Sequence, residues 1–389
     1  MPTRRQVITT SAAAVAATAI SSPSVFGANA DTINVAAILP LSGNFKVFGD
    51  QARAGLDLAV TEINRDGGIL GQQLAIHYID EESSPDRGVA AVRSVMDEVD
   101  PLAIVGPTSS AVRDAMMPEI LARRTPLLYT TDYEGGVCNR YFFCFNTVPN
   151  QETALILPYL NARFGNRYFM LGSDYVWPQR MFGQAKAMID ELGGEVVELA
   201  YKPLGTTDFS DVIGQVQDAD VDVLILAVPG DDGVAFMRQA IGANLFDSIA
   251  LNFMGFERSY LDFIGRIPGE GLFVVTPFVA DYNSPGVRDF VARILQNVGG
   301  AVTPTESALT SYNAMQALKL GMERSDEVSR EAAIDGMAGL TFNSPTGSVA
   351  IDPINHHVTL SVFLAEASGT DFKVVEALGE MAPVPRCPS

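Results

Sequence analysis

The sequence predicts an α/β protein with two Rossmann-like lobes, each built on a parallel sheet. Apolar strand segments alternate with helical segments of roughly 10–15 residues, and this rhythm pauses around residues 142–150 before it starts again. Strands that alternate with helices indicate a parallel sheet with helices on both faces. Open sheets of this kind bind ligands at the carboxyl ends of their strands, so we expect a cleft where the two lobes face each other.

The first lobe is predicted from four strands and the helices between them. Strong apolar runs indicate the strands, and positions 52, 56, 59, 60 and 63 fall at helical spacing before Asp66-Gly67-Gly68 ends that helix. The expected strands are 33–39, 74–79, 102–106 and 126–129, and the later helices are 85–99 and 110–123.

The second half of the chain repeats the pattern. Its expected strands are 168–172, 195–201, 221–228 and 271–276, and its expected helices are 178–192, 208–217 and 232–241. A long helix at 304–324 and strands at 348–351, 358–365 and 372–377 follow. These last elements are too few for a third domain, so we expect them to complete the first two.

Residues 1–30 are typical of a secretory signal peptide. Arg4 and Arg5 precede a long uncharged stretch rich in alanine, which ends in Ala28-Asn29-Ala30, a small-x-small cleavage pattern. The adjacent arginines resemble a twin-arginine export signal, with a general secretory signal as the alternative. No later segment offers the roughly 18–20 uncharged apolar residues of a membrane helix, so a soluble mature protein in the periplasm is expected.

Composition argues against two classes of function. The formal charge is −20, and removal of two arginines with the signal peptide makes it −22, which is unsuited to binding nucleic acid. The chain has three histidines, and its cysteines lack metal-ligand spacing, so neither a metal site nor a cofactor is expected. Cys138 and Cys144 could form a disulfide in an oxidising compartment, or remain as two thiols, while Cys387 lies in the tail.

The sequence contains no motif that predicts catalysis. It has no G-x-S-x-G elbow, no phosphate-binding G-x-x-x-x-G-K-[ST] loop and no G-x-G-x-x-G after a strand. The pair Glu81-Glu82 is interpreted as a solvated face, and His356-His357 as a surface turn between late strands. We therefore expect a protein that is not an enzyme.

Several strings resemble the type I periplasmic binding proteins of ABC transporters. Residues 35–43 (V-A-A-I-L-P-L-S-G), with Phe48-Gly49 and the helix end at 62–71, resemble the opening of the branched-chain amino acid receptor group. The strings at 129–135 (Y-T-T-D-Y-E-G), 149–151 (P-N-Q) and 172–178 (G-S-D-Y-V-W-P) are similar to its urea- and short-amide-binding subgroup. The resemblance spans nearly the whole mature chain.

The resemblance implies the fold and the function. Two lobes joined by a three-segment hinge would close on a small polar solute, such as urea, a short amide, an amine or an amino acid, and then dock on an ABC permease in the inner membrane. The first lobe would contain residues 31–146 and 279–325, and the second 147–278 and 326–383. A monomer or weak dimer is expected. The alternatives are an exported ligand sensor and, less favoured, an amide hydrolase.

The first lobe would contribute most of the ligand contacts. Thr108, Ser109 and Ser110 lie in the loop before a helix, where hydroxyl and backbone N–H groups suit a carbonyl or carboxylate oxygen, although helix capping by serine is an alternative for Ser109. Tyr129 and Thr131 match ligand-contacting positions of the subgroup, and Phe48 comes from the opening motif.

Asp132 departs from the subgroup pattern, which usually reads Y-P-T followed by proline or an aromatic residue. A carboxylate in a small cleft needs a cationic or strongly donating partner, so Asp132 raises the prospect of an amine, amidine or amino acid ligand. The alternative is a capping or solvated loop acid.

The second lobe would contribute aromatic side chains and one acid. Tyr175 and Trp177 follow a strand and could cover the ligand and attract a cation, or simply pack between the lobes. Asp231 follows the apolar strand that ends at Val228, and N-capping by Asp231 or Asp232 is the alternative role. Glu257 is a weaker candidate in another strand-end loop.

Overall fold

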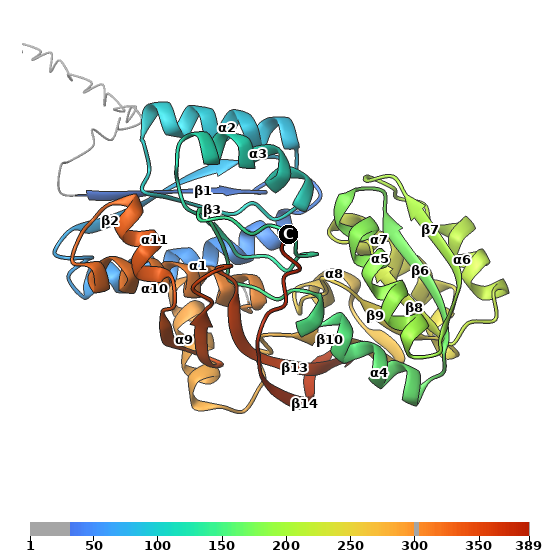
Figure 1. Ribbon diagram of the computed structural model, residues 1–389. Helices are drawn as coiled ribbons and strands as arrows, with labels where there is room; N and C mark the ends of the chain where they lie inside the picture. The colour runs from blue at the N-terminus through green and yellow to red at the C-terminus, as the bar shows by residue number, and fades with distance from the viewer. Residues whose placement is uncertain (1–31, 299–302, 389) are drawn as a thin grey trace, which may run out of the picture. The chain divides into compact units, whose positions relative to one another are not determined.

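The computed structural model describes residues 32–298 and 303–388, so the predicted signal peptide lies outside the described part of the chain. Within the described part, no helix is both long and apolar enough to cross a membrane. Two β-sheets with flanking helices organise these residues, which confirms the predicted α/β class (Figure 1).

The first sheet is parallel throughout, with the strand order β2-β1-β3-β4-β5. Helices α2 and α3 lie on one face, and α1, α10 and α11 lie on the other (Figure 1). The elements are β1 (Thr32–Leu39), α1 (Lys46–Arg65), β2 (Gln73–Asp80), α2 (Pro85–Glu98), β3 (Ala103–Val105), α3 (Ser110–Ala122), β4 (Leu127–Tyr129), β5 (Phe142–Cys144), α10 (Glu306–Ser325) and α11 (Arg330–Met337).

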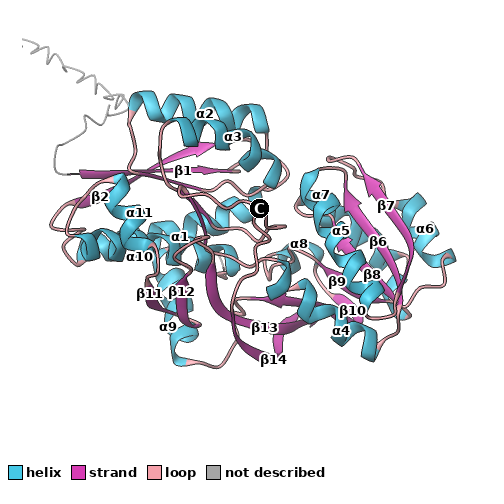
Figure 2. Ribbon diagram, viewed as in Figure 1, coloured by secondary structure: helices cyan, strands magenta, loops and turns pink. Residues whose placement is uncertain are grey.

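The second sheet is mixed, with the order β11-β12-β13-β10-β9-β8-β6-β7 and β14 paired to β13. Its parallel half is β7, β6, β8, β9 and β10, and the antiparallel strands join it through β10 and β13 (Figure 2). The strands are β6 (Arg167–Ser173), β7 (Glu195–Lys202), β8 (Val223–Ala227), β9 (Ala250–Phe253), β10 (Ile267–Thr276), β11 (Thr341–Ser344), β12 (Gly347–Ile351), β13 (Val358–Gly369) and β14 (Asp371–Met381).

The remaining helices accompany the second sheet and the segments between the sheets. They are α4 (Thr153–Arg163), α5 (Val176–Glu191), α6 (Ser210–Asp218), α7 (Asp231–Gly242), α8 (Tyr260–Ile264) and α9 (Pro285–Asn297), with 3₁₀ turns at Pro149–Gln151 and Leu245–Asp247. The late chain also returns to the first sheet, because the Cys144 amide donates to His356 O at 3.0 Å.

The predicted strands and helices are confirmed in order and type, with ends that shift by a few residues. The elements that sequence periodicity did not predict are β5, β9, β11, α4, α8, α9 and α11. The strands β5 and β9 are only three and four residues long and fully buried, so they show no alternation. Helix α4 contains Pro158, which weakens a helical pattern.

The cysteine pairing differs from the one considered first. Cys138 is bonded to Cys387, across 249 residues of sequence, and Cys144 is a buried free thiol at the end of β5. The Cys144 thiol donates to Asn146 O at 3.4 Å. The Cys138–Cys144 disulfide considered from the sequence is therefore wrong, because strand β5 turns Cys144 into the core while the C-terminal tail returns beside the loop that carries Cys138.

Two predicted surface features are also wrong. Glu81 is fully buried and accepts a hydrogen bond from the Ser84 amide at 3.0 Å, whereas Glu82 is exposed. His357 is fully buried against Tyr133, and His356 stacks on Phe143 with ring centroids 4.1 Å apart. The late turn is inserted into the first sheet's core, so its histidines pack on aromatic rings instead of facing solvent.

The disulfide provides a stability test. Cys387→Ser should lower the free energy of unfolding by about 2–4 kcal/mol, because the cross-link restricts a very long loop of the unfolded chain. Urea unfolding measures this change. Peptide mapping without reduction should join the Cys138 and Cys387 peptides and should give the same result in a Cys144→Ala control; a peptide joined through Cys144 in the native protein would contradict the assignment.

Candidate functional site

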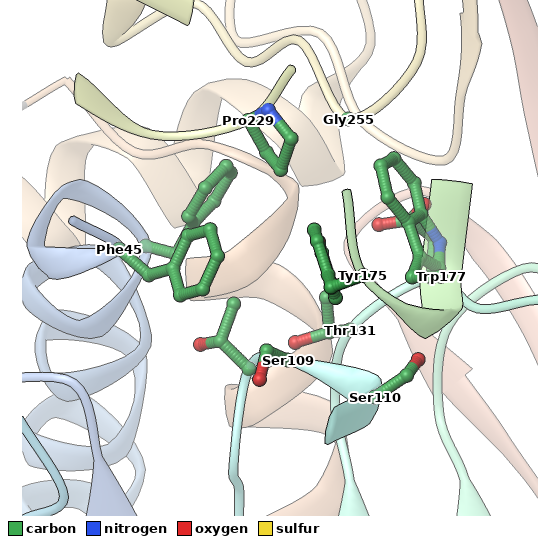
Figure 3. A pocket seen from close by; sticks show the side chains of 11 residues that line it. Phe45, Ser109, Ser110, Thr131, Tyr175, Trp177, Pro229 and Gly255 are labelled. Carbon is green, nitrogen blue, oxygen red and sulfur yellow. The ribbon is translucent and has the colours of Figure 1, made fainter. Parts of the chain in front are cut away.

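A pocket lies among the loops that follow β1, β3 and β4 of the first sheet and β6, β8 and β9 of the second (Figure 3). It encloses about 330 Å³ of space that atoms do not fill, including its open mouth. The lining residues are Phe45, Phe48, Thr108, Ser109, Ser110, Thr131, Asp132, Tyr175, Trp177, Pro229 and Gly255.

Eight of the ten candidate residues therefore line one pocket, and Tyr129 and Asp231 do not. Tyr129 lies behind it, fully buried, and its hydroxyl donates to Thr108 O at 2.8 Å. Tyr129 thus supports the loop that carries Thr108, Ser109 and Ser110. Asp231 begins α7 beside the pocket's Pro229.

The loop after β3 brings its hydroxyl groups close to the sheet. Gly106 has φ +103°, and a Cβ there would lie 2.1 Å from Ile38 O, so only glycine permits this approach. Ser109 then caps α3, because its Oγ accepts a hydrogen bond from the Val112 amide at 3.2 Å. The capping role of Ser109 is confirmed, and its own hydroxyl proton remains available to the pocket.

Ser110 belongs to a buried charged network. Its hydroxyl donates to Glu134 Oε2 at 2.7 Å and accepts from Arg113 Nη1 at 3.1 Å. Arg113 is fully buried, and its Nη2 donates to Glu134 Oε1 at 2.8 Å and to Asp114 Oδ1 at 2.7 Å. Since the single Ser110 proton is given to Glu134, the Ser110 oxygen meets the pocket as an acceptor. This differs from the expected donor.

Asp132 is the acid of the pocket. Its side chain is buried, with 7% of its surface exposed, and Oδ2 has no hydrogen-bond partner among the described residues. Burial raises the pKa of Asp132 to about 7, and the charges of Glu257 and Glu134 act in the same direction. The capped or solvated loop acid considered from the sequence does not describe this buried carboxyl.

Aromatic side chains enclose the other sides of the pocket (Figure 3). Phe45 and Phe48 come from the start of α1, and Tyr175 and Trp177 come from the start of α5. The rings of Phe45 and Tyr175 are 6.1 Å apart, and those of Tyr175 and Trp177 are stacked at 6.4 Å. Trp177 Nε1 is buried and unpartnered within the described chain, so it can donate to a ligand.

The loops of the two sheets touch beside the pocket. Asn44 Nδ2 donates to Pro229 O at 3.2 Å, and the amides of Asp231 and Asp232 donate to Asn44 O and Oδ1 at 3.0 and 3.2 Å. Gly230 occupies the N-cap position of α7. The predicted N-cap role of Asp231 or Asp232 is therefore wrong, and Asn44 from the facing loop accepts from these helix amides instead.

Glu257 lies behind the pocket and is bound to the start of α10. It accepts hydrogen bonds from Thr305 Oγ1 at 2.7 Å and from the Ser307 amide at 2.9 Å. Burial raises the pKa of Glu257 to about 6. Its role in the structure is to fix the end of this helix near Asp132.

Sequence reasoning missed Phe45, Pro229 and Gly255. All three follow strands at the edge where ligands are expected, so strand-end position was the available signal. Phe45 lies two residues after the P-L-S-G turn, and Pro229 directly follows the apolar run that contains β8 and ends at Val228.

The chain belongs to the periplasmic binding protein family, whose pattern it matches over residues 32–371. It is 23% identical to the Leu/Ile/Val-binding protein homolog 6 of Brucella suis, over 92% of this chain and 93% of the relative. It is 24% identical to the leucine-, isoleucine-, valine-, threonine- and alanine-binding protein of Pseudomonas aeruginosa, over 87% of this chain and 90% of the relative.

Solved structures confirm the type I periplasmic binding protein fold. A solute-binding protein of an ABC transporter from R. palustris, in complex with benzoate, is similar with a TM-score of 0.81 and 19% identity, over 92% of this chain and 99% of that one. The branched-chain amino acid transporter substrate binding protein LivJ from Streptococcus pneumoniae, in complex with isoleucine, has a TM-score of 0.80 and 18% identity, over 90% and 99%.

The network under Ser110 provides a second stability test. Glu134→Gln should lower the free energy of unfolding by about 3 kcal/mol, because the fully buried Arg113 loses its buried counter-charge. Asp114→Asn is the matched control, since the Asp114 side chain is 36% exposed and its ion pair is screened; a change below about 1 kcal/mol is expected. Equal effects of the two variants in urea unfolding would contradict this account.

Proposed function

We propose that this protein is the substrate-binding component of an ABC uptake transporter and encloses a small polar, nitrogen-containing solute between its two sheets. The observation that carries the proposal is the pocket itself, which draws on strand-end loops of both sheets and is flanked by the Asn44 contact with the start of α7. Membership of the periplasmic binding protein family and the names of the relatives support it.

The proposed class of solute is inferred from the residues that line the pocket. Hydroxyl groups, a carboxyl group and the indole of Trp177, whose Nε1 is buried and unpartnered within the described chain, line a small space with aromatic walls. This favours a compact polar molecule over a large apolar one. Urea, short amides, amines and amino acids remain the proposed candidates, and export by the twin-arginine route remains part of the proposal.

We propose that the two sheets are the cores of two lobes that open and close. The boundaries are those predicted from the resemblance, with residues 326–337 better grouped with the first lobe. Helix α11 supports this grouping through the ion pairs of Glu331 with Arg124 at 2.9 Å and with Arg140 at 2.7 Å. Closure would be read by the permease, and no chemistry on the solute is required.

Trp177 offers a direct test of solute binding, because it is the only tryptophan and it lines the pocket. The mature protein is screened with urea, acetamide, acetamidinium, butylamine, leucine and benzoate, by tryptophan fluorescence and by thermal shift. A true ligand at 100 times its Kd should add about 2.7 kcal/mol of stability and change the fluorescence. Trp177→Phe should remove the fluorescence but leave a residual thermal shift.

Stabilisation by none of these classes, with the protein folded by circular dichroism, would count against solute capture. Stabilisation without any response of Trp177 would place binding elsewhere in the protein.

Closure has its own test at Gly230. This residue has φ +79°, and a Cβ there would lie 2.2 Å from Asn44 O in the facing loop. Gly230→Ala should therefore weaken binding of the screened ligand at least tenfold, because the two loops can no longer meet. Gly242→Ala, at the open far end of the same helix, is the control and should bind normally. Unchanged affinity in Gly230→Ala would refute this role of the loop contact.

A further inference from the structure

A second cavity lies directly behind the pocket and shares Asp132 and Gly255 with it. About 350 Å³ within it is not filled by atoms, a volume that includes space open to solvent. Three carboxyl side chains line it, those of Asp132, Glu152 and Glu306, and the described residues supply no lysine, arginine or histidine to its wall. Its remaining lining residues are Thr153, Ile156, Asn252, Phe253, Met254, Phe256, Val274 and Val275.

The carboxyl groups of this cavity are poorly compensated. Glu306 accepts hydrogen bonds from Thr276 Oγ1 at 2.5 Å and from Asn146 Nδ2 at 3.5 Å, both neutral donors. Glu152 accepts one from the neutral Thr147 hydroxyl. Burial raises the pKa values of Glu152 and Glu306 well above the usual value, and the charge of Asp132 raises both further. Several acids held this close in a protein interior favour a bound cation.

Two buried acceptors on the cavity wall point to a ligand independently of that charge. Asp132 Oδ2 and Asn252 Oδ1 are both more than nine-tenths buried, and neither has a hydrogen-bond partner in the described chain. Buried acceptors left unpaired cost free energy unless a donor from outside the chain reaches them. Both are acceptors, so the missing group is a donor.

The front pocket also presents hydrogen-bond acceptors at the end where Asp132 lies. Ser110 presents its oxygen as an acceptor, because its proton is given to Glu134. Arg113 is the basic residue closest in sequence to Ser110. It forms ion pairs with Glu134 and Asp114 and does not line either cavity. The rings of Tyr175 and Trp177 offer faces that attract positive charge.

We propose that the solute carries a cationic nitrogen, as an amidinium, guanidinium or ammonium group, that donates to Asp132 and points from the front pocket into the acidic cavity. This inference rests on the proposed function and narrows its solute class. A planar amidinium or guanidinium group could donate two parallel N–H bonds to one carboxylate. The Ser109 hydroxyl and Trp177 Nε1–H at the front of the pocket would then meet the remainder of the solute.

Pairs of nearly equal shape and different charge test the proposal. Calorimetry on the mature protein compares acetamidinium with acetamide, and guanidinium with urea, all at millimolar concentration. We expect each cation to bind at least tenfold more tightly than its neutral partner. Asp132→Asn should weaken acetamidinium at least tenfold and change acetamide less than threefold. Glu306→Gln, which alters only the second cavity, should weaken acetamidinium severalfold.

Asp231→Asn is the matched control, because Asp231 lies beside the pocket but lines neither cavity, and it should bind both compounds as the wild type does. Circular dichroism and Tm establish that each variant is folded. Equal or tighter binding of the neutral compounds, or an equal loss in Asp231→Asn, overturns the proposal.

Solute capture and the cationic class of solute can be tested separately. If benzoate or acetamide binds through Trp177 and no compound with a cationic nitrogen does, solute capture stands and the cationic class is wrong. If no compound of any charge binds the folded protein, the proposed function itself fails, and the inference fails with it.

Discussion

The buried carboxylate of Glu134 determines how charge is distributed around the site. It accepts from Ser110, from the fully buried Arg113 and, at 2.9 Å, from Arg180 of α5. One acid thus joins the loop after β4 to α3 of the first sheet and to a helix of the second. It also uses the positive charge of Arg113, so Asp132, two residues earlier, is left without a basic partner in the described part of the protein.

This arrangement of charges explains both solute binding and closure. The unpaired Asp132 and the acidic cavity behind it are stabilised by a donor that enters from the front, while the aromatic rings of α1 and α5 cover that donor from both sheets. Asn44 then bonds the start of α7, and the contact is close because Gly230 has no side chain. A ligand that contacts both sheets favours the closed arrangement by its differential affinity for it.

Much of this could be predicted from the sequence, because local patterns determine it. The alternation of apolar strands and amphipathic helices predicted the order of elements, and strand-end position with motif resemblance predicted eight residues of the pocket. Features that depend on distant contacts were not predictable. The partner of Cys138 lies 249 residues away, and His356 and His357 are buried only because their turn inserts beside β5.

The acidic cavity shows most clearly why features that depend on distant contacts could not be predicted from the sequence. Glu152, Asn252 and Glu306 come from three separate segments, and no spacing along the chain relates them to Asp132. The direction of the Ser110 hydroxyl likewise depends on Glu134, 24 residues away. From the sequence alone, a serine at the start of a helix is expected to donate a hydrogen bond to a ligand, because the group that accepts its proton is not known.

Proton release on binding tests the central claim most directly. Burial raises the pKa of Asp132 to about 7 and that of Glu257 to about 6, and it raises the pKa values of Glu152 and Glu306 well above their usual value, whereas Glu134 is paired with Arg113. A cation should displace protons from these carboxyls, because it favours their charged forms. Calorimetry with acetamidinium at pH 7, in buffers of different ionisation enthalpy, should show about half a proton or more released per cation bound. Tight binding with no proton release would contradict the account.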